Sequence, residues 1–89
     1  MNYLKNRGRI EIVSMIIEAT NNGATKTKIM YKSMLSYNQL KEYLSVLIEN
    51  SFIEYIDGTQ TFRPTEKGFK FLKIYNETGE LLQTTKATN

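Results

Sequence analysis

Thr27-Lys28-Ile29-Met30-Tyr31, followed by Leu35-Ser36-Tyr37-Asn38-Gln39-Leu40-Lys41-Glu42-Tyr43-Leu44, is the stretch of sequence that decides the fold. Further along the chain come Phe52-Ile53-Glu54-Tyr55-Ile56-Asp57-Gly58 and Pro64-Thr65-Glu66-Lys67-Gly68. Apolar residues recur at helical spacing in the first part and alternate as in a strand in the second. The sequence therefore predicts a short helix, a tight turn, a second helix, a hairpin and a capped helix, in that order.

A further helix precedes this stretch. We expect residues 1–8 to be a flexible basic arm that ends at Gly8, and apolar residues then recur every three or four positions from Arg9 to Asn21. Asn22-Gly23 supplies a helix stop, because glycine adopts the left-handed conformation without strain. We expect the buried stripe of this first helix to consist of Ile10, Val13, Ile16 and Ile17.

The two helices of the central stretch are expected to begin at capping residues. Thr25 is placed to cap the shorter one, which directs three lysines outward, and the turn covers residues 33–35. Ser36 caps the longer helix, which runs to Asn50. Its predicted buried face falls within a third of the helical wheel and comprises Tyr37, Leu40, Leu44, Leu47 and Ile48.

The hairpin and the last helix complete the predicted fold. Residues 52–56 and 60–63 read as strands around Asp57-Gly58, Pro64 ends the second strand, and Thr65 caps the final helix. The fold class is mainly α with a small two-stranded β wing: a winged helix-turn-helix with an extra C-terminal helix. The predicted parts are an arm at 1–8, the winged domain at 9–64, the C-terminal helix at 65–82 and a polar, disordered tail at 83–89.

The C-terminal helix carries two apolar stripes. One, formed by Phe69, Leu72 and Tyr75, is enough to dock the helix on its own domain. The other needs another partner, since exposing it creates an apolar patch, and a second copy of the chain is the economical candidate. The alternative is a single helix sunk deeply into the core. The predicted homodimer interface consists of Phe71, Ile74, Thr78 and Leu81.

Composition excludes several classes of function. The chain has no cysteine and no histidine, which removes disulfides, thiolate metal sites and the commonest general base. No glycine-rich loop for phosphates is present, so we expect no enzyme, no metal, no cofactor and no small-molecule substrate. No apolar run approaches the ~18 residues that span a bilayer. A cytoplasmic protein is the simplest interpretation.

The net charge of +3 permits binding to nucleic acid without demanding it, and the placement of the charges is more informative. The predicted longer helix can lock one face to the core and offer the other to the major groove of double-stranded DNA. Amide side chains in its first turns suit adenine, and lysines of the preceding helix suit phosphates. The candidate DNA-binding residues are Lys26, Lys28, Lys32, Ser36, Asn38, Gln39, Lys41, Glu42, Ser45 and Arg63, with arm contacts from Lys5, Arg7 and Arg9.

The residues quoted in the opening paragraph, from Thr27 to Gly68, resemble the archaeal small winged-helix regulators. The sequence is most similar to the ten-kilodalton archaeal chromatin-associated proteins, over about residues 9 to 76. The resemblance implies an archaeal or archaeal-virus source, a dimer paired through the last helix as an antiparallel coiled coil, and binding to double-stranded DNA. Gly79 departs from the family pattern, because the family's last helix is long and uninterrupted. A winged helix that docks on a protein within a transcription or chromatin complex is the alternative function.

Overall fold

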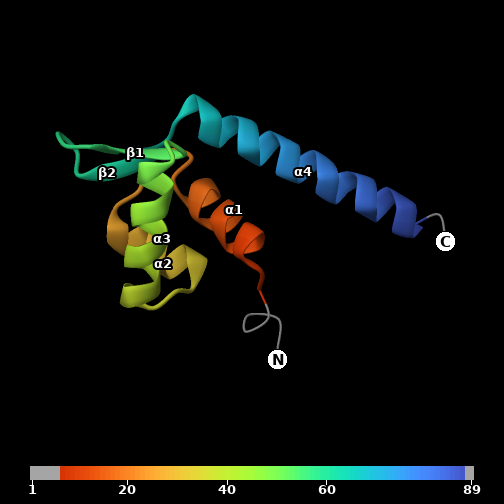
Figure 1. Ribbon diagram of the computed structural model, residues 1–89, viewed down its shortest axis with the longest axis horizontal. Coiled ribbons are helices and arrows are strands. Elements are labelled where there is room, and N and C mark those ends of the chain that lie inside the picture. Colours follow the sequence, from red (N-terminus) through yellow and green to blue (C-terminus); the bar gives the residue numbers. More distant parts are fainter. Residues whose placement is uncertain (1–6, 88–89) are drawn as a thin grey trace.

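The computed structural model describes the backbone of residues 7–87 and the side chains of residues 7–82. Its elements follow the predicted order, and the winged helix-turn-helix with an added C-terminal helix is confirmed (Figure 1). Lys5 lies outside the described residues. The elements are α1 (Arg9–Ala19), α2 (Lys26–Ser33), α3 (Tyr37–Glu49), β1 (Ile53–Ile56), β2 (Thr61–Pro64) and α4 (Glu66–Ala87).

Three short polar side chains start the helices, as predicted. The Thr25 hydroxyl accepts a hydrogen bond from the Lys28 amide at 3.2 Å, and the Thr65 hydroxyl accepts one from the Gly68 amide at 3.1 Å. Ser36 caps α3. Each hydroxyl satisfies one of the backbone donors that a helix leaves open at its first turn. At the end of α2, Met34 takes a left-handed conformation with φ 54° and turns the chain toward α3.

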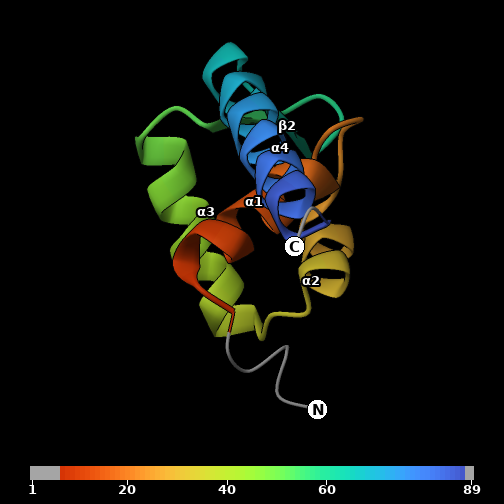
Figure 2. The ribbon, with the colours of Figure 1, turned by 90° about the vertical axis from the view of Figure 1, so that its right-hand side faces the viewer.

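The core lies where α1, α2, α3 and the sheet meet, and α4 closes it from one side (Figure 2). Its buried side chains include Ile16, Ile17, Ile29, Leu40, Leu44, Leu47, Ile53, Phe62 and Leu72. Three predicted core residues are instead exposed: Ile10 by 60%, Tyr37 by 52% and Ile48 by 42%. Ile10 sits in the first turn of α1, at the outer end of the helix. Tyr37 and Ile48 lie on one edge of α3, beside the leucine stripe and outside it.

The wing is an antiparallel pair in which Ile53 faces Pro64 and Ile56 faces Thr61. Pro64 is therefore the last residue of β2. The prediction was wrong here, because it gave a strand of residues 60–63 with Pro64 beyond its end. The turn covers residues 57–60, and its positive φ, 55°, falls on Gln60. A third segment joins the far side of β2, where Ala24 exchanges two backbone hydrogen bonds with Phe62 at 3.0 and 2.8 Å.

The helix α4 is longer than predicted, since it continues through Gly79 to Ala87 and does not end at residue 82. Its first turns lie against α1, and its remainder extends past the body of the domain (Figure 1). Leu72 is buried, but Phe69, assigned to the same stripe, is 47% exposed. Phe71, assigned to the dimer interface, is half-buried. Its ring packs edge-on against the Phe52 ring of the same domain, with 5.8 Å between the ring centroids. Among the described residues, no helix combines the length and apolarity needed to cross a membrane.

Candidate nucleic-acid interface

The outward face of α3 is free of core contacts. Leu40, Leu44 and Leu47 anchor the opposite face in the core. Because a helix places these leucines within about 60° of one another, the polar residues between them point away from the domain. The exposed side chains Asn38, Lys41, Glu42 and Ser45 line one shallow hollow together with Val46. The structure thus brings four of the predicted site residues together on one surface.

Two further predicted residues of α3 are engaged in capping the helix. The Gln39 backbone N–H donates to the Ser36 hydroxyl at 3.2 Å, and the Ser36 backbone N–H donates to the Gln39 side-chain oxygen at 3.0 Å. This reciprocal pair is a capping box, and the sequence signal for it is Ser-x-x-Gln before an apolar run. Bidentate recognition of adenine uses both the oxygen and the NH₂ group of an amide. Gln39 is therefore a poorer candidate for reading bases than Asn38.

One edge of the α3 face holds an aromatic ring between two lysines. The Lys26 ammonium, from the start of α2, lies 5.7 Å from the centroid of the Tyr37 ring. The Lys41 ammonium, one turn further along α3, lies 5.8 Å from the same centroid. Tyr37 was expected in the core, so sequence reasoning missed it as a site residue. Its position one residue after a helix cap and four before a lysine was the available signal.

The three lysines of α2 do not form the single group that the sequence analysis expected. Lys28 and Lys32 line a hollow beside Glu18 and Asn21, at the end of α1. Lys26 instead lies against Tyr37. The reason is helical geometry, because residues two apart in a helix point about 200° away from each other. Only Lys26 of the three adjoins the α3 face.

The two arginines nearest the amino end have different surroundings. Arg9 lines a hollow with Gln39, Glu42 and Val46, so it flanks the α3 face on the edge opposite Tyr37. The Arg7 guanidinium donates to the backbone oxygens of Ser33 and Met34, the latter at 3.0 Å. A cation at the carboxyl end of a helix satisfies open carbonyls and matches the helix dipole. The structure thus gives Arg7 a structural contact at the end of α2.

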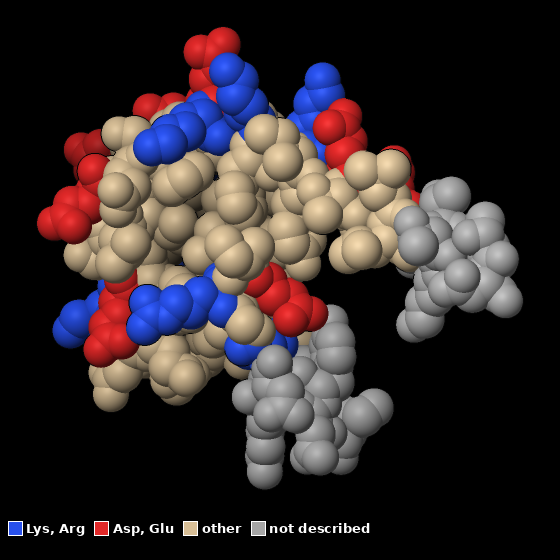
Figure 3. All heavy atoms as spheres, turned by 45° about the vertical axis from the view of Figure 1, so that its right-hand side comes forward, with Lys and Arg blue, Asp and Glu red and all other residues tan. Residues whose placement is uncertain are grey.

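The charged side chains alternate in sign over the face that Figure 3 shows, with acidic groups beside the basic ones. No single uniform basic patch covers that face. On α3 itself, Glu42 shares the hollow that Lys41 lines. On that face and on α3, any attraction to an anionic partner is therefore local to a few cations.

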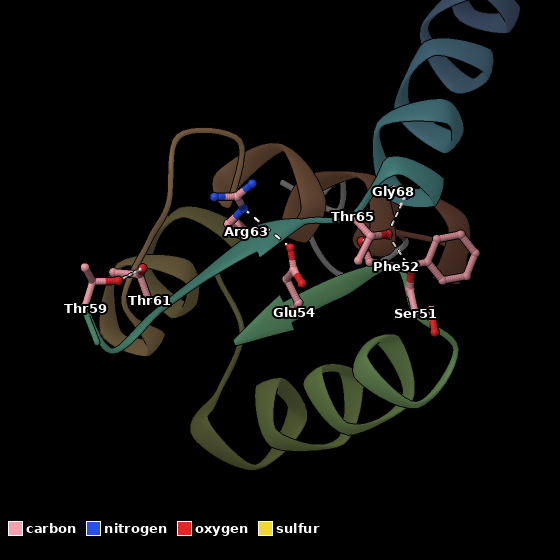
Figure 4. Close-up of polar contacts among 8 residues, drawn as sticks. All are labelled: Ser51, Phe52, Glu54, Thr59, Thr61, Arg63, Thr65 and Gly68. Atoms are coloured by element: carbon pink, nitrogen blue, oxygen red, sulfur yellow. Dashed lines mark hydrogen bonds and ion pairs between the residues drawn. The ribbon is translucent and has the colours of Figure 1, made fainter. Parts of the chain in front are cut away.

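The wing places its arginine away from α3. Arg63 forms an ion pair with Glu54 directly across the two strands, at 3.5 Å (Figure 4). It also lines a hollow with Asn21, Asn22 and Thr61. The predicted site residue Arg63 is thus not brought together with the residues of the α3 face. A half-exposed pair of this kind contributes little to stability.

Comparison with known proteins agrees with this architecture. A family model described as winged helix-turn-helix matches residues 6–83. An uncharacterized protein of Methanocaldococcus jannaschii is 35% identical over 81 residues, which cover 90% of this chain and 37% of that protein.

The crystal structure of Sso10a-2, a DNA-binding protein from Sulfolobus solfataricus, superposes with a TM-score of 0.73 at 20% identity and covers 92% of this chain and 88% of that one. Both of these proteins come from archaea, in agreement with the resemblance to archaeal winged-helix proteins. The chain belongs to the winged helix-turn-helix family.

Proposed function

We propose that this protein binds double-stranded DNA without catalysing a reaction, and that it inserts the exposed face of α3 into the major groove. The observation that carries the proposal is the outward display of Asn38, Lys41 and Ser45 on a helix anchored by three buried leucines. A helix held in this way can approach base edges without losing core packing. The structural neighbour named as a DNA-binding protein supports the same function.

The residues of this face divide into two chemical roles. Asn38 offers an amide that pairs with adenine in bidentate fashion, and Glu42 can accept from the amino group of cytosine. Lys26, Lys41 and Arg9 lie on the two edges of α3, where phosphates of the two strands border the groove. The edge cations supply affinity, whereas Asn38, Glu42 and Ser45 supply any preference for sequence. The Lys28 and Lys32 side chains lie on the other side of α2 and act only at longer range.

We further propose that two copies of the chain pair through α4. Phe71, Ile74, Thr78 and Leu81 follow one another at intervals of three and four residues, the spacing of a coiled-coil seam. The Ile74 side chain is 58% exposed beyond the point where α4 leaves the body. Because α4 continues through Gly79 to Ala87, the part of the helix that extends past the body of the domain is available for pairing (Figure 1).

The DNA proposal is tested by titrating fluorescent duplexes of random and A·T-rich sequence at several salt concentrations. Each phosphate contact adds about 0.9 to the slope of log affinity against log salt. We expect the double variant Lys26→Met with Lys41→Met, which loses two phosphate contacts, to lower the magnitude of this slope by about 1.8. The pair Lys28→Met with Lys32→Met removes the same charge and is the matched control. Equal losses in the two pairs would show that the α3 edge has no special role.

The comparison of the two duplexes also separates the biological roles. A chromatin-associated protein binds both with similar affinity, because it contacts mainly the backbone. A regulator of particular promoters prefers certain sequences, and Asn38→Ala then relaxes that preference with little effect on the salt slope.

The dimer is tested by sedimentation of the wild-type protein and of Ile74→Glu. We expect the variant to sediment as a monomer, because a carboxylate in an apolar seam is costly to desolvate. Asn76→Glu introduces the same side chain on the opposite side of α4 and should remain a dimer. A wild-type protein that sediments as a monomer at micromolar concentration would contradict the proposed seam.

A protein-docking function is the second candidate, and the alternation of acidic and basic side chains favours it. Under this alternative the same titration shows no duplex binding even at low salt, and a stoichiometric protein partner is recovered with the chain.

A further inference from the structure

We propose that Tyr37 is a positioning residue for DNA binding: its ring holds the ammonium groups of Lys26 and Lys41 ready for phosphates at one edge of α3. This inference rests on the proposed function and extends it to a residue that is neither buried nor charged. The Tyr37 ring contacts lysines of two helices: Lys26 is the first residue of α2, and Lys41 lies one turn further along α3.

The geometry sets an upper limit on the distance between the two ammonium nitrogens. Both ammonium groups lie within 6 Å of the ring centroid, the range over which a cation is attracted to the negative face of an aromatic ring. Because both distances end on the same point, the separation of the two nitrogens does not exceed their sum, about 11.5 Å. Two ammonium groups held at one ring repel each other, and the attraction of each group to the ring offsets part of that repulsion.

The benefit of the ring is a lower entropy cost on binding. A free lysine side chain samples many rotamers and loses most of them when it contacts a phosphate. A side chain already resting on an aromatic ring has lost some of that freedom before DNA arrives, so less is lost in the complex. Tyr37 is 52% exposed, so its phenol can also donate a hydrogen bond to a phosphate oxygen of the same strand.

The test compares Tyr37→Leu and Tyr37→Phe with the wild-type protein on one random duplex at low salt. Leucine removes the aromatic face but keeps an apolar side chain, so we expect affinity to fall by roughly fivefold to tenfold. Phenylalanine keeps the face, and we expect a loss of less than about threefold, which measures the hydroxyl alone. Tyr31→Leu, at a tyrosine of α2 that is 84% exposed, is the matched control and should bind as the wild type does.

Two readouts separate positioning from a merely structural role. First, in a protein that already carries Lys26→Met and Lys41→Met, Tyr37→Leu should lower affinity no more than Tyr37→Phe does, because the ring then has no cation to hold and only the hydroxyl is lost. Second, in the free protein, NMR resonances of the Lys26 and Lys41 Cε protons should show ring-current shifts that Tyr37→Phe keeps and Tyr37→Leu removes. Thermal unfolding of each variant confirms that the domain remains folded.

The outcomes are distinguishable. A wild-type protein that binds DNA while Tyr37→Leu binds equally well overturns this inference and leaves the proposed function intact. A loss of affinity that persists undiminished without the two lysines also overturns it. A wild-type protein that binds no duplex overturns the proposed function, and with it any role of Tyr37 in DNA binding.

Discussion

The first turn of α4 depends on the absence of a side chain at Gly68. A Cβ atom at this position would lie 2.2 Å from the backbone oxygen of Phe52 and 3.3 Å from Cβ of Pro64. That oxygen cannot easily move, because it accepts a hydrogen bond from the Thr65 backbone amide at 3.1 Å and lies 3.2 Å from the Thr65 hydroxyl, whose proton is shared with the Ser51 backbone oxygen (Figure 4). Gly68→Ala should therefore force α4 away from the start of the wing. Overpacking of this kind costs about 1–3 kcal/mol, and we expect a loss near 2 kcal/mol.

The matched control is the same substitution later in the same helix. A Cβ at Gly79 would meet nothing within 4 Å, and Gly79 lies on a different side of α4 from the predicted seam. Gly79→Ala should stabilise the protein by about 0.5–1 kcal/mol, because alanine loses less backbone entropy in a helix. Thermal and urea unfolding followed by circular dichroism measure both, and 1 kcal/mol corresponds to roughly 4–8 °C in Tm for a domain of this size. A Gly68→Ala protein as stable as the wild type would refute the close approach, since helix propensity alone favours alanine at both positions.

Three further substitutions test contacts that hold the helix ends. Thr65→Val removes the cap of α4 and should lower the free energy of unfolding by about 1–2 kcal/mol, measured by urea denaturation, whereas Thr65→Ser should recover most of it. Ser36→Ala breaks the capping box of α3 and should cost about 1 kcal/mol in the same assay; an unchanged midpoint would mean that the box does not form in solution. Arg7→Met should cost about 1 kcal/mol by loss of its bonds to the end of α2, and should leave the salt slope of DNA binding unchanged. A lower slope in that variant would restore Arg7 as a DNA contact.

The features of the fold that depend on local chemistry could be predicted from sequence. Thr25, Ser36 and Thr65 were identified as helix starts because a short hydroxyl side chain before an apolar periodic run has one dominant use. The wing was predicted because alternation of β-forming residues around Asp57-Gly58 is a strong hairpin signal. These signals need no knowledge of what lies elsewhere in the chain.

The errors concern side chains at the edge of a buried stripe. Periodicity gives the direction in which Tyr37, Ile48 and Phe69 point, but whether an edge residue is covered depends on a neighbouring element that the sequence does not place. The end of α4 was predicted too early for a different reason. An isolated glycine within a helix costs only about 1 kcal/mol, which flanking helix-forming residues readily offset.

Polar side chains offer a second route to the candidate site, by elimination. Gln39 is used in the cap of α3 and Arg7 at the end of α2. Lys67 likewise donates to the Asn50 backbone oxygen at 2.9 Å. Each of these contacts stabilises the domain itself, so each would have to be broken before the side chain could serve a partner, at a cost that weakens binding.

The polar residues of the α3 face do not take part in capping a helix. Asn38, Lys41 and Ser45 can meet a ligand without loss of a cap, and the contact of Lys41 with Tyr37 leaves its ammonium group near the surface. Their concentration on one face of a single well-anchored helix is therefore the strongest structural support for the proposal that this face, and not the wing, binds DNA.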